Sequence, residues 1–162
     1  MNMTARLITT FIALVFSATV LAEIKLEHTA QVEKIEKDAE GKEVIKLVPA
    51  DLVVPGNVVV YTVKATNTGN APAEKIVINN AISEHVLYIA DSASSVAIGK
   101  NTTITFSVDG GKNYAAPEQL TVTENNVSRA ATPADYTHIR WQLNFALEPQ
   151  KSTRVFFKAR LK

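Results

Sequence analysis

The stretch that decides the fold is residues 54–72, which read Val-Pro-Gly-Asn-Val-Val-Val-Tyr-Thr-Val-Lys-Ala-Thr-Asn-Thr-Gly-Asn-Ala-Pro. It opens with Pro55-Gly56, a dipeptide typical of turns, and it closes with a cluster of turn-forming residues from Asn67 to Pro72. Between these turns the side chains alternate, and one face carries Val59, Tyr61, Val63 and Ala65. The pattern predicts a long strand near the centre of a sheet.

The rest of the chain repeats this period of two. Alternation predicts further strands over residues 23–34, 44–48, 75–79, 86–90, 102–108, 120–123, 137–143 and 153–161. Turn signals separate them about every eight to twelve residues, and the one helix-like stretch, residues 81–86, is at most one turn long. We therefore expect an all-β domain, an antiparallel two-sheet sandwich of the immunoglobulin-like kind.

The N-terminal 22 residues have the three parts of a signal peptide. Arg6 is the basic residue of the first part, and an apolar run of about fifteen residues follows from Leu7 to Leu21. Val20-Leu21-Ala22 then matches a small-x-small cleavage site. The apolar run is shorter than the roughly twenty residues that span a bilayer, so an uncleaved membrane anchor is the weaker alternative. We expect cleavage after Ala22 and export to the periplasm or the extracellular space.

The remaining residues, 23–162, suffice for one domain with its own core. Residues 23–48 are expected to form an N-terminal hairpin, and residues 50–162 the main part of the sandwich. The sequence leaves open whether this hairpin pairs with the edge of its own sandwich or with another chain.

Charge and cysteine content bear on the possible partners. The chain has 17 Lys and Arg against 16 Asp and Glu, spread along its length, and Arg6 would leave with the signal peptide. Such a balanced surface argues against nucleic acid or an anionic membrane as a partner. The chain contains no cysteine, so it has no disulfide, no thiol nucleophile and no thiolate metal ligand.

One motif lies in the turn after the strand 102–108. Ser107, Asp109, Gly111 and Tyr114 resemble the Asp-box, a hairpin signature Ser-x-Asp-x-Gly-x-x-aromatic in which the last position is usually tryptophan. Asp109 is suited to accept amide hydrogen bonds within its own turn, a glycine supplies a positive φ, and Tyr114 is placed to pack back over the hairpin. We interpret the motif as a structural turn. Calcium or glycan binding by the same residues is the alternative.

Tyr61, Trp141 and Phe157 are the predicted aromatic residues of the core, since each lies on the apolar face of a predicted strand. If Trp141 and Tyr136 were exposed, they could form a platform on which sugars stack. They are an odd number of positions apart, however, and therefore face opposite sides of a strand. Core packing is the favoured interpretation.

No arrangement of residues predicts catalysis. The three histidines, His28, His85 and His138, lie on different predicted elements, and none has a second ligand at a spacing typical of metal sites. His28 lies on the apolar register of the first strand, so we expect it to be partly buried. The sequence has no Gly-x-Ser-x-Gly motif and no phosphate-binding glycine loop. We expect neither an enzyme, nor a cofactor, nor a bound metal.

An internal isopeptide bond is a further alternative. It would require Lys64, Asn144 and Glu148 to meet in the core. On the strand pattern, Lys64 points away from the face that carries Val63 and Ala65, which argues against this cross-link.

The chain also resembles a known family. The stretch 54–63, its continuation 66–73 and the segments 76–80, 87–89, 91–94 and 155–160 resemble the conserved-repeat family of bacterial envelope proteins called domain of unknown function eleven. The resemblance covers roughly residues 50–162. It implies an immunoglobulin-like sandwich in secreted, periplasmic or cell-surface proteins, often in tandem copies and without assigned catalysis. Here there is one copy, and Gln150 stands where the family often has a turn glycine.

These observations predict a non-catalytic structural or protein-interaction module of the bacterial cell envelope, whose partner is an envelope or surface protein. The predicted contact surfaces are the loops Asn67–Ala73 and Ser92–Asn101 and the hairpin Asp109–Glu118, because the strands are needed for the core. The alternative is a carbohydrate- or calcium-binding accessory domain that uses Asp109, Tyr114 and Tyr136.

Overall fold

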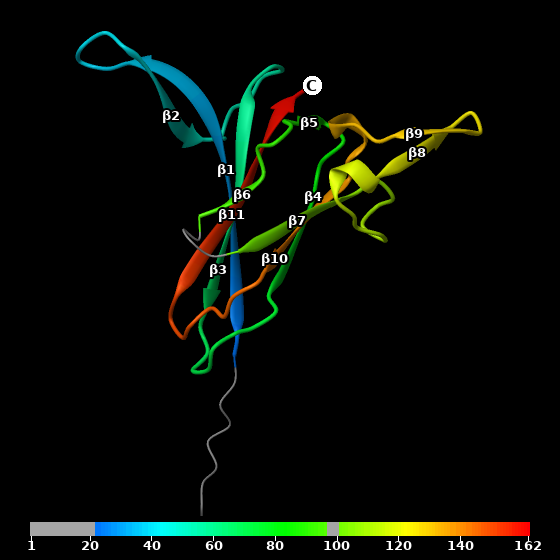
Figure 1. Cartoon of the computed structure of the whole chain (residues 1–162). Helices are drawn as coiled ribbons and strands as arrows, with labels where there is room; N and C mark the ends of the chain where they lie inside the picture. The colour runs from blue at the N-terminus through cyan, green and yellow to red at the C-terminus, as the bar shows by residue number, and fades with distance from the viewer. Residues whose placement is uncertain (1–21, 97–100) are drawn as a thin grey trace, which may run out of the picture.

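A computed structural model of the chain describes residues 22–96 and 101–162. It is an all-β sandwich of antiparallel sheets, as predicted (Figure 1). The first sheet contains β1 (Ile24–Lys37), β2 (Glu43–Pro49), β3 (Val58–Asn67), β5 (Val86–Tyr88), β6 (Ser94–Ser95) and β11 (Ser152–Leu161). The second contains β4 (Val77–Ala81), β7 (Thr102–Ser107) and β10 (His138–Leu143).

The first sheet has the order β2-β1-β3-β11, with β5 and β6 pairing with the outer edge of β11. The strand predicted from residues 54–72 is β3, and it lies in the middle, as expected from its β-branched residues. The first half of β1 pairs with β3, from Ile24 opposite Asn67 to Val32 opposite Val59. The N-terminal hairpin therefore pairs within its own chain, which resolves the question that the sequence left open.

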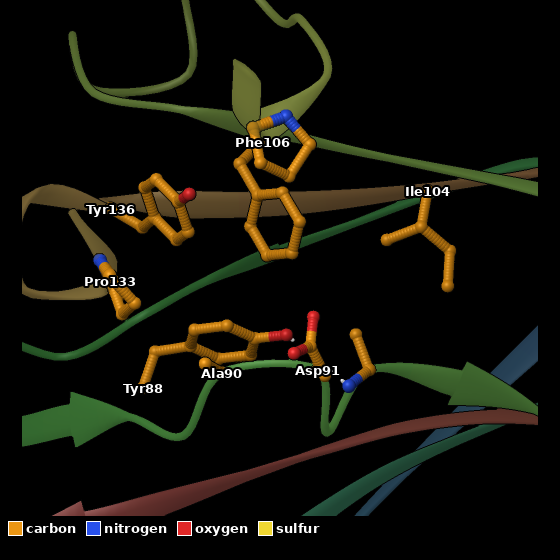
Figure 2. Close-up of a pocket in the computed structure, with 9 residues that line it drawn as sticks. Tyr88, Ala90, Asp91, Ile104, Phe106, Pro133 and Tyr136 are labelled. Atoms are coloured by element: carbon orange, nitrogen blue, oxygen red, sulfur yellow. Dashed lines mark hydrogen bonds between the residues drawn. The ribbon is translucent and has the colours of Figure 1, made fainter. Parts of the chain in front are cut away.

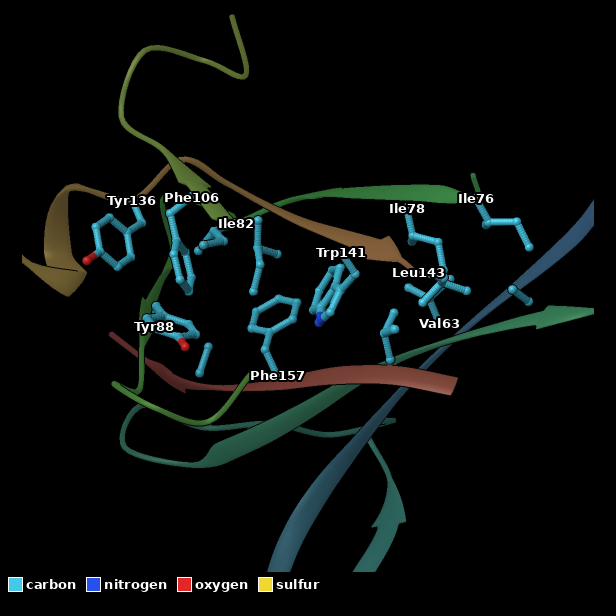
Figure 3. Close-up of a cluster of buried hydrophobic side chains, with 14 of the residues drawn as sticks. Val63, Ile76, Ile78, Ile82, Tyr88, Phe106, Tyr136, Trp141, Leu143 and Phe157 are labelled. Atoms are coloured by element: carbon cyan, nitrogen blue, oxygen red, sulfur yellow. The ribbon is translucent and has the colours of Figure 1, made fainter. Parts of the chain in front are cut away.

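The core lies between β3 and β11 on one side and the second sheet on the other. Phe157 is opposite Tyr61 in the β11–β3 register, and their rings stack with centroids 5.0 Å apart. Trp141 of β10 reaches down to Phe157 and is fully buried (Figure 3). Tyr61 is half-buried and packs against this core. The alternating apolar residues of each strand therefore meet in one interior.

Several boundaries differ from those that alternation predicted. β4 begins at Val77 rather than residue 75, because Lys75 has a φ of 53°. β5 ends at Tyr88 rather than residue 90, because Asp91 has a φ of 58° and Ser92 N donates to Ile89 O in a turn. Such left-handed residues break the extended backbone of a strand.

The helix-like stretch at residues 81–86 contains no helix. That segment is the end of β4 followed by a turn in which Val86 N donates to Ser83 O. Two short 3-10 helices occur elsewhere, Pro117–Gln119 (η1) and Pro133–Asp135 (η2), each with proline in its first turn. Proline favours this position because its fixed φ suits a helix start and its missing N–H is not needed there.

A separate hairpin of β8 (Thr121–Glu124) and β9 (Val127–Ala130) projects from the second sheet, at the right of Figure 1. Asn125 and Asn126 connect the strands with φ values of 51° and 63°, as in a two-residue turn with two left-handed residues. Arg129 fastens the hairpin to η2 by donating from both terminal nitrogens to Asp135, at 2.8 and 2.9 Å. β9 was not predicted.

The predicted signal peptide, apart from Ala22, lies outside the described residues. In the described part of the chain no helix is both long and apolar enough to cross a membrane.

Candidate functional site

The Asp109 turn is held together by its own side chains. Ser107 Oγ donates to Asp109 Oδ1 at 2.7 Å, and the same oxygen accepts from the backbone amides of Lys112 and Asn113 at 3.1 and 3.0 Å. Asp109 Oδ2 accepts from Asn113 Nδ2 at 2.7 Å. Both carboxylate oxygens are therefore engaged inside the turn. This geometry favours the structural interpretation of the motif over calcium binding.

Gly111 and Tyr114 complete this turn. Gly111 has a φ of 83°, and a Cβ at this position would come within 3.1 Å of the Tyr114 hydroxyl and 3.2 Å of the His138 ring. Any side chain here would meet both a strained backbone and a crowded site. The Arg140 guanidinium lies 3.6 Å from the centre of the Tyr114 ring, which pins that ring against β10.

The Asp109 turn predicts a specific pH dependence. Hydrogen bonds from the Asn113 amide and from Ser107 hold the pKa of the Asp109 carboxyl well below its ordinary 3.8. A lowered folded-state pKa gives stability that is present above pH 3.8 and is lost as the pH falls below it. Asp109→Asn should lower the melting temperature at neutral pH and flatten its decline between about pH 5 and about pH 2.

Thermal unfolding followed by circular dichroism across this pH range measures the effect. Asp51→Asn is the matched control, because Asp51 is an exposed carboxylate outside the turn. The interpretation fails if Asp109→Asn and Asp51→Asn change the pH profile equally.

An aromatic cleft of about 290 Å³ opens at the end of the sandwich where β5 faces β7 (Figure 2). Its walls are Tyr88, Phe106 and Tyr136, and Ala90, Asp91, Ala93, Ile104, Pro117 and Pro133 complete the lining. Phe106 and Tyr136 stack with centroids 4.5 Å apart, and Tyr88 is tilted against Phe106 at 5.1 Å. The cleft has the size and polarity to hold a small, mainly apolar group.

Of the three rings that form this cleft, sequence reasoning named only Tyr136 as a candidate residue; Ala93 and Pro117 of the lining lie in the predicted contact segments. Tyr136 is 8% exposed and Trp141 is fully buried, so the two do not form the sugar-stacking platform considered above. The other wall residues come from β5 and β7, which are far apart in the sequence and read as ordinary strands. Only the sandwich topology brings these rings together.

The three histidines are spread over the molecule. His28 is exposed on β1, which corrects the prediction that it would be partly buried, and His85 is exposed beside Glu84. His138 is half-buried, with Nδ1 3.2 Å from Thr137 Oγ1. Over residues 22–96 and 101–162, no three His, Asp or Glu side chains converge as a metal site requires.

The residues of the possible isopeptide are also separated. Lys64 Nζ donates to Glu27 on the outer face of the first sheet, at 3.2 Å. Asn144 Nδ2 donates to Thr103 Oγ1, near the edge of the second sheet, at 2.8 Å. This alternative was wrong, because the two side chains lie on different sheets.

The predicted contact loops differ in character. Asn67 is fully buried, and its Nδ2 ties the loop Asn67–Ala73 to its surroundings by donating to Ala71 O and Leu147 O at 2.7 and 2.8 Å. The loop Ser92–Asn101 lies partly outside the described residues. The segment Asp109–Glu118 begins with the turn described above. None of these loops exposes a cluster of large apolar side chains in the described chain.

The exposed apolar cluster that sequence reasoning missed lies on the N-terminal hairpin. Beyond Glu33, the ends of β1 and β2 extend past the two sheets, at the upper left of Figure 1. We call residues 34–47 the arm. Ile35 is opposite Ile45 in the register, and Leu47 lies two residues further on the same face. These side chains are 69%, 64% and 44% exposed.

The arm is a well-formed hairpin despite this exposure. Asp38 Oδ1 accepts from the amides of Glu40 and Lys42 at 3.1 and 2.8 Å, and Gly41 has a φ of 81°. On the opposite face, Lys46 donates to Glu36 at 3.2 Å. One face of the arm therefore carries this ion pair together with Lys34 and Val44, and we call it the charged face. The other, which we call the apolar face, carries Ile35, Ile45 and Leu47 open to solvent, with Lys37 and Glu43 opposite each other nearer the turn.

Comparisons of the chain with protein-family models, with curated proteins and with solved structures found no match.

Proposed function

We propose that this protein is a non-catalytic interaction module of the bacterial cell envelope, exported by its N-terminal signal peptide, and that it binds another envelope protein through the arm. The observation that carries this proposal is the exposed apolar face of Ile35, Ile45 and Leu47. A two-stranded hairpin is only marginally stable alone in water, and an exposed cluster of large apolar side chains on it is typical of a binding surface.

The geometry of β2 adds to this argument. β2 is an edge strand, and among the described strands it pairs with β1 alone. The backbone groups along its free side can accept a partner strand, while its alternate side chains Ile45 and Leu47 offer apolar contacts. The sandwich fold agrees with what the resemblance to the envelope-protein family implies, and we include membership of that family in the proposal.

Site-specific photo-crosslinking in intact bacteria tests the function. A photoreactive residue at position 45 should give a crosslinked band that contains an envelope protein, because this side chain lies on the apolar face. The same residue at position 46 is the matched control, since it lies on the same strand but points to the charged face. Periplasmic and culture fractions are analysed separately, so that the experiment also locates the protein.

Ile35→Glu should weaken the band from position 45, because it places a charge directly opposite Ile45 in the register. Equal bands from positions 45 and 46, or no band from either, would contradict the proposal.

A carbohydrate- or calcium-binding accessory domain is the second candidate function. The aromatic cleft supports this candidate, because its three rings can stack against a small ligand. Asp91, the one charged residue of its lining, can accept hydrogen bonds from that ligand. For calcium the observations are less favourable, because the Asp109 oxygens are occupied. A saturable rise in melting temperature with a glycan or with calcium would support this candidate.

A further inference from the structure

The outer edge of β4 has no strand beside it in the described chain. Within residues 22–96 and 101–162, β4 pairs only with β10, and Leu143 N donates to Ile76 O while Ile82 N donates to Thr137 O. In an antiparallel pair, alternate residues point their backbone groups to the partner, so Ile78 and Asn80 also face β10. The backbone groups of Val77, Asn79 and Ala81 therefore face outward, away from the sheet.

This edge lacks the usual features that prevent strand pairing. Natural edge strands are protected by charged residues, proline or a bulge. Val77–Ala81 contains neither a charge nor a proline, and its register with β10 is regular. Val77 is 46% exposed. Ala81 O already accepts from Asn80 Nδ2 at 2.8 Å, and the other outward-facing backbone groups of the edge can pair with a further strand.

The sheet below this edge is incompletely covered. Leu26 and His28 of β1 are opposite Ala65 and Val63, which face the core, so both point toward the second sheet. Leu26 is nevertheless 43% exposed, and His28 is exposed as well. The second sheet ends at β4 and does not extend over them. A strand added to the outer edge of β4 would occupy this place.

A groove marks the opening between the two sheets. It measures about 440 Å³ and is lined by Ala22, Ile24, Leu26, Ala73, Glu74, Ile76, Val77 and Ile78. All of these residues are apolar except Glu74, which lies at the end of the groove where β4 begins. An occupant that matches this lining has apolar side chains along its length and a basic group beside Glu74.

We propose that this open side of the sandwich accepts one extended strand from a partner protein, antiparallel to β4, with alternating apolar residues and a basic residue at its C-terminal end. The inference rests on the proposed interaction function and adds a second contact surface to the arm. A second copy of the chain fits less well, because antiparallel pairing of two β4 edges about a two-fold axis at Asn79 would place Ala81 of one copy opposite Val77 of the other and would bring no lysine or arginine to Glu74.

A strand fused to the protein tests whether the outer edge of β4 accepts a further strand, and this test does not require the natural partner to be known. Lys162 N donates to His85 O, so the C-terminus lies at the end of the sandwich that β4 approaches with Ala81. A Gly/Ser linker of about ten residues spans roughly 16–19 Å, enough to start a strand there. The fused segment is Thr-Val-Thr-Val-Thr-Val-Lys, and the control fusion carries the linker followed by Ser and Gly alone.

The fused strand should raise the melting temperature by about 2–6 °C relative to the control fusion. It should also slow hydrogen exchange of the Val77, Asn79 and Ala81 amides by at least about tenfold, while Ile78 and Asn80, already paired with β10, change little. Unchanged exchange at these three amides would overturn the proposal.

Asn79→Pro is the decisive variant. Proline is tolerated on an edge strand where the N–H points outward, so the fold should survive, but pairing with an added strand should be lost. Asn79→Ala is the control, because it removes the same hydrogen bond to Arg140 and keeps the amide. A fused strand that stabilises Asn79→Pro as much as Asn79→Ala would contradict the proposed pairing.

A photoreactive residue at position 77 extends the test to cells. The proposal expects a band with a partner protein that Asn79→Pro abolishes and Asn79→Ala preserves. A band that contains a second copy of this chain would overturn the proposed occupant. The fusion experiment needs no natural partner, so its result can be interpreted even if the crosslinking experiment at position 45 contradicts the proposed function. Equally, a failed fusion experiment would not affect the crosslinking result at position 45.

Discussion

Trp141→Ala should lower the free energy of unfolding by about 3–5 kcal/mol, the largest effect that we expect from a single substitution. Trp141 is fully buried, and its ring centroid lies 6.2 Å from that of Phe157 at the contact between the two sheets. Its removal would leave a cavity that the surrounding strands cannot close, because their positions are fixed by the sheets on both sides. Urea unfolding followed by circular dichroism measures the change.

Trp141→Phe provides the comparison. The indole Nε1 has no hydrogen-bond partner among the described residues. Replacing the indole by a phenyl ring therefore removes an unsatisfied buried donor and breaks no hydrogen bond. We expect Trp141→Phe to cost less than half as much as Trp141→Ala. A loss below about 1 kcal/mol for Trp141→Ala would show that this side chain does not join the sheets as described.

Asn67→Ala should lower the free energy of unfolding by about 2–4 kcal/mol. The Asn67 side chain is fully buried, donates to Ala71 O and Leu147 O, and accepts from Gly69 N at 3.0 Å. Alanine would leave the Ala71 carbonyl and the Gly69 amide without these partners. Three hydrogen bonds are lost together and the fully buried side chain leaves a cavity, which is why the effect exceeds that of one hydrogen bond.

Two further substitutions sharpen this measurement. Thr66→Ala, at the neighbouring position, removes an exposed hydroxyl contact with Ser152 and should change the unfolding free energy by less than about 0.5 kcal/mol. Asn67→Asp keeps the shape but replaces two donors by acceptors and buries a charge, so it should be at least as harmful as Asn67→Ala at neutral pH. Equal, small effects of Thr66→Ala and Asn67→Ala would contradict the role given to Asn67.

The sandwich could be predicted because its central strands alternate over most of their length. In β3, the period from Val59 to Ala65 gives both the strand and its buried face. Gln150, which stands where the resembling family often has glycine, has a φ of 60°, the conformation that favours glycine. The turns at Gly41 and Gly56 could also be predicted from their glycines, and both residues have a positive φ in the structure.

The remaining features depend on contacts that alternation does not encode. His28 lies on the core-facing register of β1, but its burial depends on how far the second sheet extends, and that sheet ends at β4. The aromatic cleft needs β5 and β7 to meet at one end of the sandwich. The β8–β9 hairpin is different, because the sequence itself contains a two-residue turn signal for it, Asn125-Asn126.

The shared strand β1 has a mechanical consequence. Its first half is bonded to β3 in the body and its second half to β2 in the arm, so a pull on the arm is transmitted along a single continuous strand. Tension along that strand acts parallel to β3 and loads the whole row of hydrogen bonds at once instead of opening them one by one. A partner held at the arm would therefore be tethered to a part of the sandwich that resists being pulled apart.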